Sequence, residues 1–194
     1  MRLTIAIGLG LVLSACTASG PHGPVIEPGH VFPGDNLSVT WPNSEGWHLS
    51  TSRRNEWVFA KQGTAPDDTY IAVISWFGLP SAIAPPDFVA FIKQRADEDI
   101  DQKRFKDLKS SVEYSDERKY PCVHYHAQAT DTEPLTESGR KAPLLLQVEH
   151  FDCKNPLLTD MAFAAVYSHR GNEPDPEFQQ EAADFFAGIQ VPGH

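Results

Sequence analysis

The sequence predicts an α+β fold, in which an antiparallel β-sheet of about six to seven strands carries two packed helices. The predicted segments follow the order strands, helix, four strands, helix, and an antiparallel sheet joined by hairpins is the economical arrangement for that order. At least two strand segments are apolar on both alternating faces, which places the helices on opposite faces of the sheet. The length of 194 residues and the 41% of hydrophobic residues suit a single core.

The first strands are predicted from three segments. Leu37, Val39 and Trp41 alternate and stop at Pro42, residues 57–60 form a short apolar run, and residues 70–77 are apolar on both faces. Four further strand segments follow the first helix, near 110–116, 120–130, 143–152 and 160–168. The last of these is apolar on both faces and is expected to be central. His169-Arg170-Gly171 after it is interpreted as a turn, with an anion site as the alternative.

Two amphipathic segments predict the helices. The first starts near Asp87 and presents apolar residues at helical spacing, namely Phe88, Phe91, Ile92, Ala96 and Ile100. The second is expected to start at Asp175-Pro176, because Asp is a favourable N-cap and Pro suits the first turn. Its expected buried residues are Phe178, Ala182, Phe185, Phe186 and Ile189.

The N-terminus has the pattern of a secretory signal. Arg2 precedes the apolar run 3–13, and the small residues Ser14 and Ala15 lead to Cys16. Leu13-Ser14-Ala15-Cys16 resembles the lipobox of bacterial lipoproteins, in which the chain is cut before the Cys and the new N-terminal Cys is acylated. The resemblance implies that Cys16 anchors the mature chain in a lipid bilayer, and Thr17 in place of Asp favours the periplasmic face of the outer membrane. Ordinary secretion is the alternative.

The domain organisation follows from this signal and from a region rich in Pro and Gly. Residues 1–15 are the predicted signal peptide, 16–34 the lipidated Cys with a tether, and 35–194 a single globular domain. Residues 20–34 contain four Gly and four Pro, a composition that disfavours a helix or a central strand.

A resemblance of pattern covers about residues 36–191. The order of elements, with Trp41-Pro42 and Gly46-Trp47 near the start and Phe185-Phe186-Ala187-Gly188-Ile189 at the end, resembles the Mog1/PsbP-like α/β/α sandwich. The resemblance implies partner binding or assembly more often than catalysis, although a fold does not fix a function.

The remaining cysteines, Cys122 and Cys153, are even in number, as expected of a disulfide in an oxidising compartment. If segments 120–130 and 143–152 form a hairpin, a register that pairs the two cysteines places them directly opposite each other at its open end. We therefore expect a disulfide. A redox pair or a thiol metal site is the alternative, although no Cys-x-x-Cys is present.

The same register gives the strongest candidate for a metal site. His124 and His126 are two residues apart and share a face, and Glu149 lies opposite His126. Two nitrogens and a carboxylate suit Zn²⁺ or Cu²⁺. The alternative is an exposed polar face with a His–Glu cross-strand pair.

The remaining function classes are narrowed by charge and by motifs. A net charge of −10 disfavours binding to nucleic acid, because phosphate contacts need a basic surface. The sequence contains no Gly-x-Ser-x-Gly, His-Glu-x-x-His or Gly-x-x-x-x-Gly-Lys-Ser/Thr motif. We therefore expect no catalytic residue and no cofactor. The tryptophans Trp41, Trp47 and Trp57 are expected in the core, with a ligand groove as the alternative.

These observations together predict a membrane-anchored periplasmic lipoprotein with a non-catalytic binding or assembly role and an envelope protein as partner. A periplasmic module that binds a metal or small ligand through His124, His126 and Glu149 is the alternative. An enzyme without linear motifs is a third possibility.

Overall fold

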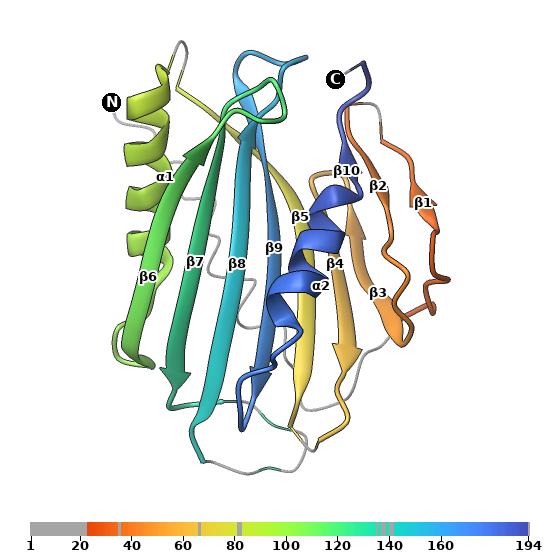
Figure 1. The fold of residues 1–194 in the computed structure, drawn as a ribbon, viewed down its shortest axis with the longest axis vertical. Helices are drawn as coiled ribbons and strands as arrows, with labels where there is room; N and C mark the ends of the chain where they lie inside the picture. Colours follow the sequence, from red (N-terminus) through yellow and green to blue (C-terminus); the bar gives the residue numbers. More distant parts are fainter. Residues whose placement is uncertain are drawn as a thin grey trace.

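The computed structural model describes residues 23–193 except 35, 66, 81–82, 135, 137–138 and 140–141. The predicted signal peptide and Cys16 lie outside the described residues. The centre of the fold is a seven-stranded antiparallel sheet (Figure 1). Its strands lie in the order β3 (Trp47–Arg53), β4 (Glu56–Gln62), β5 (Thr69–Gly78), β9 (Met161–Gly171), β8 (Leu144–Lys154), β7 (Cys122–Asp131) and β6 (Phe105–Ser115).

The α+β class predicted from the sequence is confirmed, and β9 is the central strand. It pairs with β5 on one side and with β8 on the other, and its side chains are buried on both faces. The strand continues through Gly171, three residues beyond the predicted end. The interpretation of His169-Arg170-Gly171 as a turn was therefore wrong, because His169 and Arg170 are paired strand residues that point to opposite faces.

A second, three-stranded sheet was not predicted. It has the order β1 (Val31–Phe32), β2 (Ser38–Thr40) and β10 (Ile189–Gln190). Strands of two or three residues are too short to show an alternating pattern, which is why β1 and β10 escaped the sequence analysis. β10 follows the C-terminal helix directly, so the end of the chain returns to pair with β2.

This small sheet also corrects the predicted domain boundary at residue 35. Ile26 is buried, and the ring of Phe32 contacts those of Trp57 and Phe59. The segment from Pro24 to Gly34 is therefore folded onto the domain and is not a free tether. Its prolines and glycines did not prevent this, because the apolar residues between them provide buried surface.

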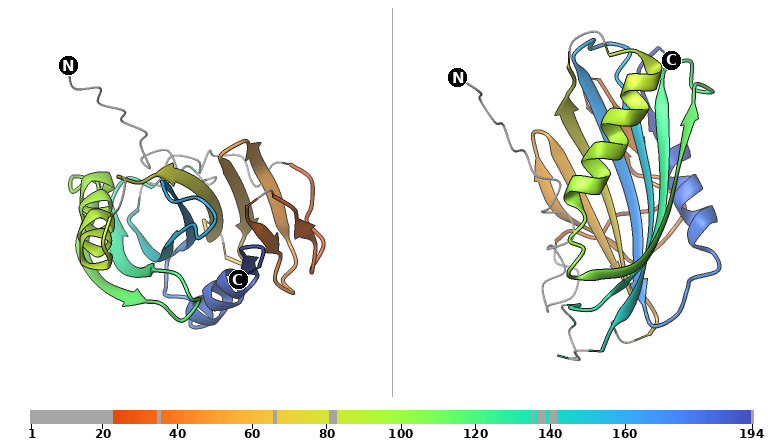
Figure 2. Two further views of the ribbon diagram at one scale, coloured as in Figure 1. Left: turned by 90° about the horizontal axis from the view of Figure 1, so that it is seen from above. Right: turned by 90° about the vertical axis from the view of Figure 1, so that its left-hand side faces the viewer.

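The two helices cover opposite faces of the large sheet, as predicted. α2 (Phe178–Ala187) packs with the β9 residues Phe163, Ala165 and Tyr167. α1 (Pro85–Asp99) contacts the alternate residues Ala162 and Ala164 through Phe88 and Ile92. We call these faces of the sheet the α2 face and the α1 face. Seen from above, the sheet is strongly curved (Figure 2).

The start of α2 differs from the prediction by a few residues. The helix begins at Phe178, and Oδ1 of Asp175 accepts a hydrogen bond from the N–H of Glu177 in the preceding turn. The predicted stripe is otherwise confirmed, since Phe178, Ala182, Phe185 and Phe186 are buried.

Candidate functional site

The hairpin of β7 and β8 has the predicted register. Cys122 lies opposite Cys153, and the two residues form a disulfide. Both side chains belong to the core of the α2 face, so the bond links the two strands beneath packed apolar residues. The disulfide prediction is confirmed.

The same register brings the three predicted metal ligands together. Nδ1 of His126 donates to Oε1 of Glu149 at 2.6 Å, and Nε2 of His124 lies 3.4 Å from Oε2 of the same carboxylate. Both imidazole rings are partly exposed, while the Glu149 side chain is only 9% exposed. The ring of His124 also contacts the rings of Phe151 and Phe186. The three residues thus form a cluster at the border of the α2 core.

In this cluster the Glu149 carboxylate is paired with the two histidines, and the three side chains are not arranged around a space for a metal ion. One Glu149 oxygen is hydrogen-bonded to a histidine nitrogen, and the other lies closest to the second histidine. Within the described part of the chain, no group of three or more His, Cys, Asp or Glu residues is arranged to hold a metal ion. The cross-strand His–Glu pair, which was the alternative expectation, is present.

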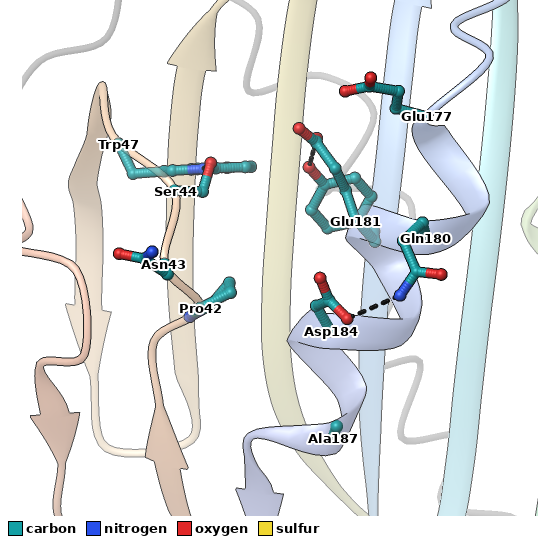
Figure 3. A pocket seen from close by; sticks show the side chains of 10 residues that line it. Pro42, Asn43, Ser44, Trp47, Glu177, Gln180, Glu181, Asp184 and Ala187 are labelled. Atoms are coloured by element: carbon teal, nitrogen blue, oxygen red, sulfur yellow. Dashed lines mark hydrogen bonds between the residues drawn. The ribbon is translucent and has the colours of Figure 1, made fainter.

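A groove runs along α2, where the connection from β2 to β3 approaches the helix (Figure 3). Its volume is about 590 Å³. We call it the α2 groove and define it by its lining residues: Pro42, Asn43, Ser44, Trp47, Tyr167, Glu177, Gln180, Glu181, Asp184 and Ala187. Figure 3 shows Asn43 and Ser44 on one side, facing Glu181 and Asp184 on the helix.

The ammonium of Lys61, which does not itself line the α2 groove, contacts three residues that do. Nζ of Lys61 lies 3.6 Å from Oε1 of Glu181, above the ring of Trp47 at 5.5 Å and above that of Tyr70 at 4.7 Å. The ammonium also reaches Oγ of Ser44 at 3.5 Å. A carboxylate and aromatic faces are together the surroundings that stabilise an ammonium group away from bulk water.

The groove carries more negative charge than Lys61 balances. Glu177, Glu181 and Asp184 lie along one side of α2, and only Glu181 has an ion pair within the described residues. Asp184 accepts a hydrogen bond from Gln180, which leaves its charge in place. A positively charged group that enters the groove therefore meets carboxylates that have no cation of their own.

The buried tyrosines of this region act as hydrogen-bond donors. Tyr167 donates to Glu181 at 2.5 Å, and Tyr70 donates to Asp175 at 2.9 Å. Burial, together with the neighbouring carboxylates, raises the pKa of both phenols far above their ordinary value of 10.0. Both hydroxyls therefore keep their protons at any physiological pH and fix the positions of the carboxylates.

A second polar network lies behind Tyr70, away from the groove. Nε2 of His169 is hydrogen-bonded to Oδ1 of Asp68 at 2.5 Å, and its Nδ1 to Oε1 of Gln147 at 3.0 Å. The ring of His169 packs against that of Tyr70. Because this histidine is almost fully buried, the network connects β5, β8 and β9 and does not form an accessible site.

The lining of the α2 groove lacks the residue types of nucleophilic catalysis. It contains no histidine and no cysteine, and Ser44 is its one serine. The nearest basic group to that hydroxyl, Lys61, is ion-paired with Glu181, which is the arrangement of a structural cation. A nucleophile next to an available base, the pattern of covalent catalysis, is therefore absent from this lining.

Sequence reasoning found only part of this groove. Trp41 and Trp47 are buried as expected, Trp57 is partly buried against the same core, and Trp47 also contributes to the lining of the groove. The other groove residues come from the connection at 42–44, from β9 and from α2. The one available signal was the repetition of acidic residues at Glu177, Glu181 and Asp184, which places them on one side of a helix.

Comparisons with known proteins support the fold. No protein-family model matches the sequence, and no curated protein sequence matches it significantly. A solved structure of a protein from Bacteroides thetaiotaomicron VPI-5482 is similar, with a TM-score of 0.50 and 13% sequence identity. The likeness covers 86% of this chain and 50% of that one, so this chain spans half the length of the protein it matches. At this identity the likeness concerns the fold alone.

Proposed function

We propose that this chain is a lipid-anchored, non-catalytic binding protein of the bacterial cell envelope. Acylated Cys16 holds it at the periplasmic face of the outer membrane, and the α2 groove receives a cationic side chain of an envelope protein partner. The observation that carries the binding role is the groove itself, in which aromatic faces lie beside unbalanced carboxylates.

The disulfide and the N-terminal sequence support the compartment. Structural disulfides persist in oxidising compartments such as the bacterial periplasm. The bond between Cys122 and Cys153 is buried in the core of the α2 face, and the N-terminus has the pattern of a lipoprotein signal. Within the described residues, no helix is both long and apolar enough to cross a membrane.

The internal lysine supports the choice of ligand. The ammonium of Lys61 lies against the groove residues Trp47 and Glu181, so these side chains already hold one cation. Glu177 precedes Glu181 by about one turn and Asp184 follows it by about one turn, and both offer charge for a second cation. A lysine or arginine side chain presented by a partner protein matches this pattern, because it combines a cationic end with an apolar stem.

A titration tests the binding role. The full-length chain, extracted in mild detergent, is titrated with a peptide of alternating Gly and Lys in an isothermal calorimeter, with a Gly–Gln peptide of equal length as the control. The Lys peptide is expected to bind, and the double variant Glu177→Gln, Asp184→Asn is expected to bind it roughly five- to tenfold more weakly. Equal binding by the variant, or no difference between the two peptides, contradicts the proposal.

Mass spectrometry tests the anchor separately. The chain extracted from bacterial membranes is expected to have an intact mass that starts at Cys16 and includes acyl groups. A mass without acylation removes the envelope anchor from the proposal and leaves the groove to be judged by the titration.

Metal binding by His124, His126 and Glu149 stays a prediction from the sequence. The three side chains lie close together, which favours a metal site. Both histidines, however, already lie against the Glu149 carboxylate, which argues against one. Titration with Zn²⁺ decides between these arguments: identical heats from the wild type and His126→Ala exclude the site.

A further inference from the structure

The two edges of the large sheet differ in what covers them. Along β3, the preceding segment pairs through an isolated bridge between Val25 and His48, and the N–H of Leu49 donates to the carbonyl of Pro24 at 3.0 Å. Along the outer side of β6, no strand of the described part of the chain is paired. One edge is therefore partly covered by the chain itself, and the other is open.

β6 is long for an open edge. It has eleven residues, whereas exposed edges in natural proteins are usually short or disrupted. A disruption occurs only near its start, where Asp107 has a φ of 54° and the register is irregular between Lys106 and Lys109. Residues 109–114 therefore form a regular strand with an open edge.

The side chains of this regular segment are largely exposed. Tyr114 is 39% exposed, and Leu108, just before the segment, is 40% exposed, although both are large and hydrophobic. By their register with β7, Tyr114 points to the α1 face, and Lys109 and Glu113 point to the α2 face. The segment thus offers apolar groups on one face and one charge of each sign on the other.

The order of these residues is complementary to itself. Opposite residues of an antiparallel pair share a face, so two identical strands related by a two-fold axis are centred on a residue that meets its own copy. With Ser111 at the centre, Lys109 lies opposite Glu113 of the second copy. This pair of opposite charges occurs twice, and such pairs stabilise a sheet.

The neighbouring registers lack this complementarity. Centring on Ser110 places Lys109 opposite Ser111. Centring on Val112 places Lys109 opposite Ser115, so the lysine has no carboxylate partner. Ser111 is therefore the favoured centre.

We propose that β6 pairs antiparallel with β6 of a second copy of this chain, with the two-fold axis at Ser111. The pairing joins the two seven-stranded sheets edge to edge and leaves the α2 groove of each copy outside the contact. It does not depend on the proposed ligand or on the lipid anchor.

Oxidative cross-linking tests the register. The variant Ser111→Cys is made in the full chain and oxidised in membranes, and the products are separated on a non-reducing gel. Because the two introduced thiols face each other across the axis, a disulfide-linked dimer is expected in high yield. Ser52→Cys, on the opposite edge strand β3, is the matched control and is expected to give little dimer, as is the wild type. Equal yields from Ser111→Cys and Ser52→Cys overturn the proposal, and so does cross-linking of residue 111 to a protein of another mass.

A charge exchange provides a second test. Sedimentation of the chain in mild detergent gives the dissociation constant of the dimer, which Lys109→Glu or Glu113→Lys alone is expected to raise roughly tenfold, since each places like charges opposite each other. The double exchange restores opposite charges and is expected to restore the wild-type constant. A monomer at all concentrations, or a double variant no better than the single ones, overturns the proposal. Retention of the Cys122–Cys153 disulfide in each variant shows that it has folded.

Discussion

The two faces of the large sheet are stabilised in different ways. On the α2 face, buried residues of both sheets and of α2 form one continuous cluster, in which Trp41 contacts the rings of Trp47, Phe59 and Phe185. On the α1 face, the apolar residues that the structure describes fall into four separate clusters, and charged residues are buried beside them. Stability therefore comes from aromatic packing on one face and depends on charge pairing on the other.

The α1 face contains two buried carboxylates in contrasting surroundings. Asp131 accepts two hydrogen bonds from the Arg104 guanidinium, both at 2.8 Å, and lies 3.2 Å from Nε of Arg170. Asp152 lies 3.5 Å from Nε2 of His150, and its Oδ2 has no hydrogen-bond partner. Burial raises the pKa of both carboxyls, but the two arginines outweigh this effect at Asp131 and lower its pKa, whereas burial dominates at Asp152 and raises it.

The largest expected effect compares one substitution on the two helices. Phe185 in α2 and Phe88 in α1 are both fully buried. Replacing either by Ala is expected to reduce the free energy of unfolding by about 3–5 kcal/mol. Phe185→Ala should lie at the upper end, because the surrounding rings hold the cavity open, and Phe88→Ala at the lower end. Urea unfolding measures both, and a larger loss at Phe88 contradicts the contrast between the faces.

Asp131→Asn tests the charge pairing of the α1 face. Loss of the carboxylate leaves Arg104 and Arg170 without their shared anion, so the free energy of unfolding at pH 7 is expected to fall by about 3 kcal/mol. The folded-state pKa of Asp131 lies below its ordinary value of 3.8. The stability that the ionised Asp131 contributes is therefore present above pH 3.8, and it is lost as the pH falls through the lower, folded-state pKa. The difference between wild type and variant should therefore shrink in acid, and a constant difference from pH 7 to pH 2 rejects this account.

The disulfide contributes less than the core beside it. The two cysteines are 31 residues apart in sequence, for which chain entropy gives about 3–4 kcal/mol as an upper value. Because the hairpin already keeps the strands together, the double variant Cys122→Ala, Cys153→Ala is expected to lose about 2–3 kcal/mol and to keep its fold. A complete loss of the cooperative transition would show that aromatic packing alone does not maintain the α2 face.

The smallest expected effect is that of Asp152→Asn, and its pH dependence has the opposite sign to that of Asp131→Asn. The raised pKa means that ionisation of Asp152 destabilises the folded state as the pH rises from 3.8 through the folded-state value. The free energy of unfolding of the variant is expected to differ from that of the wild type by no more than about 1 kcal/mol. The variant is expected to become more stable relative to the wild type over that pH range. Urea midpoints at pH 3, 5 and 7 measure this trend, and a relative loss with rising pH contradicts it.

Local patterns predicted most of the fold, and long-range geometry supplied the rest. The register of β7 and β8 followed from two cysteines, because one disulfide fixes every other pair in a hairpin. The helical stripes at Phe88 and Phe185 followed from their spacing. β3 was missed because its sequence from His48 to Arg53 is mostly polar, and such an edge strand lacks an apolar period.

The candidate site was harder to predict than the fold. The hairpin partners His124, His126 and Glu149 were placed correctly, because they belong to one local register. The α2 groove joins residues far apart in sequence, such as Ser44 and Asp184, and no periodicity connects them. The ammonium position of Lys61 depends on rings from two different strands, which only the assembled sheet brings together.

The pairing of residues 24–26 with β3 determines how far the domain can travel from the bilayer. If Cys16 carries the lipid as proposed, only eight peptide units separate the anchor from Pro24, whose carbonyl is already bonded to Leu49. Fully extended, they span at most about 28 Å. The domain would then stay close to the membrane surface. A partner must therefore extend to within that distance of the surface or be embedded in the same membrane.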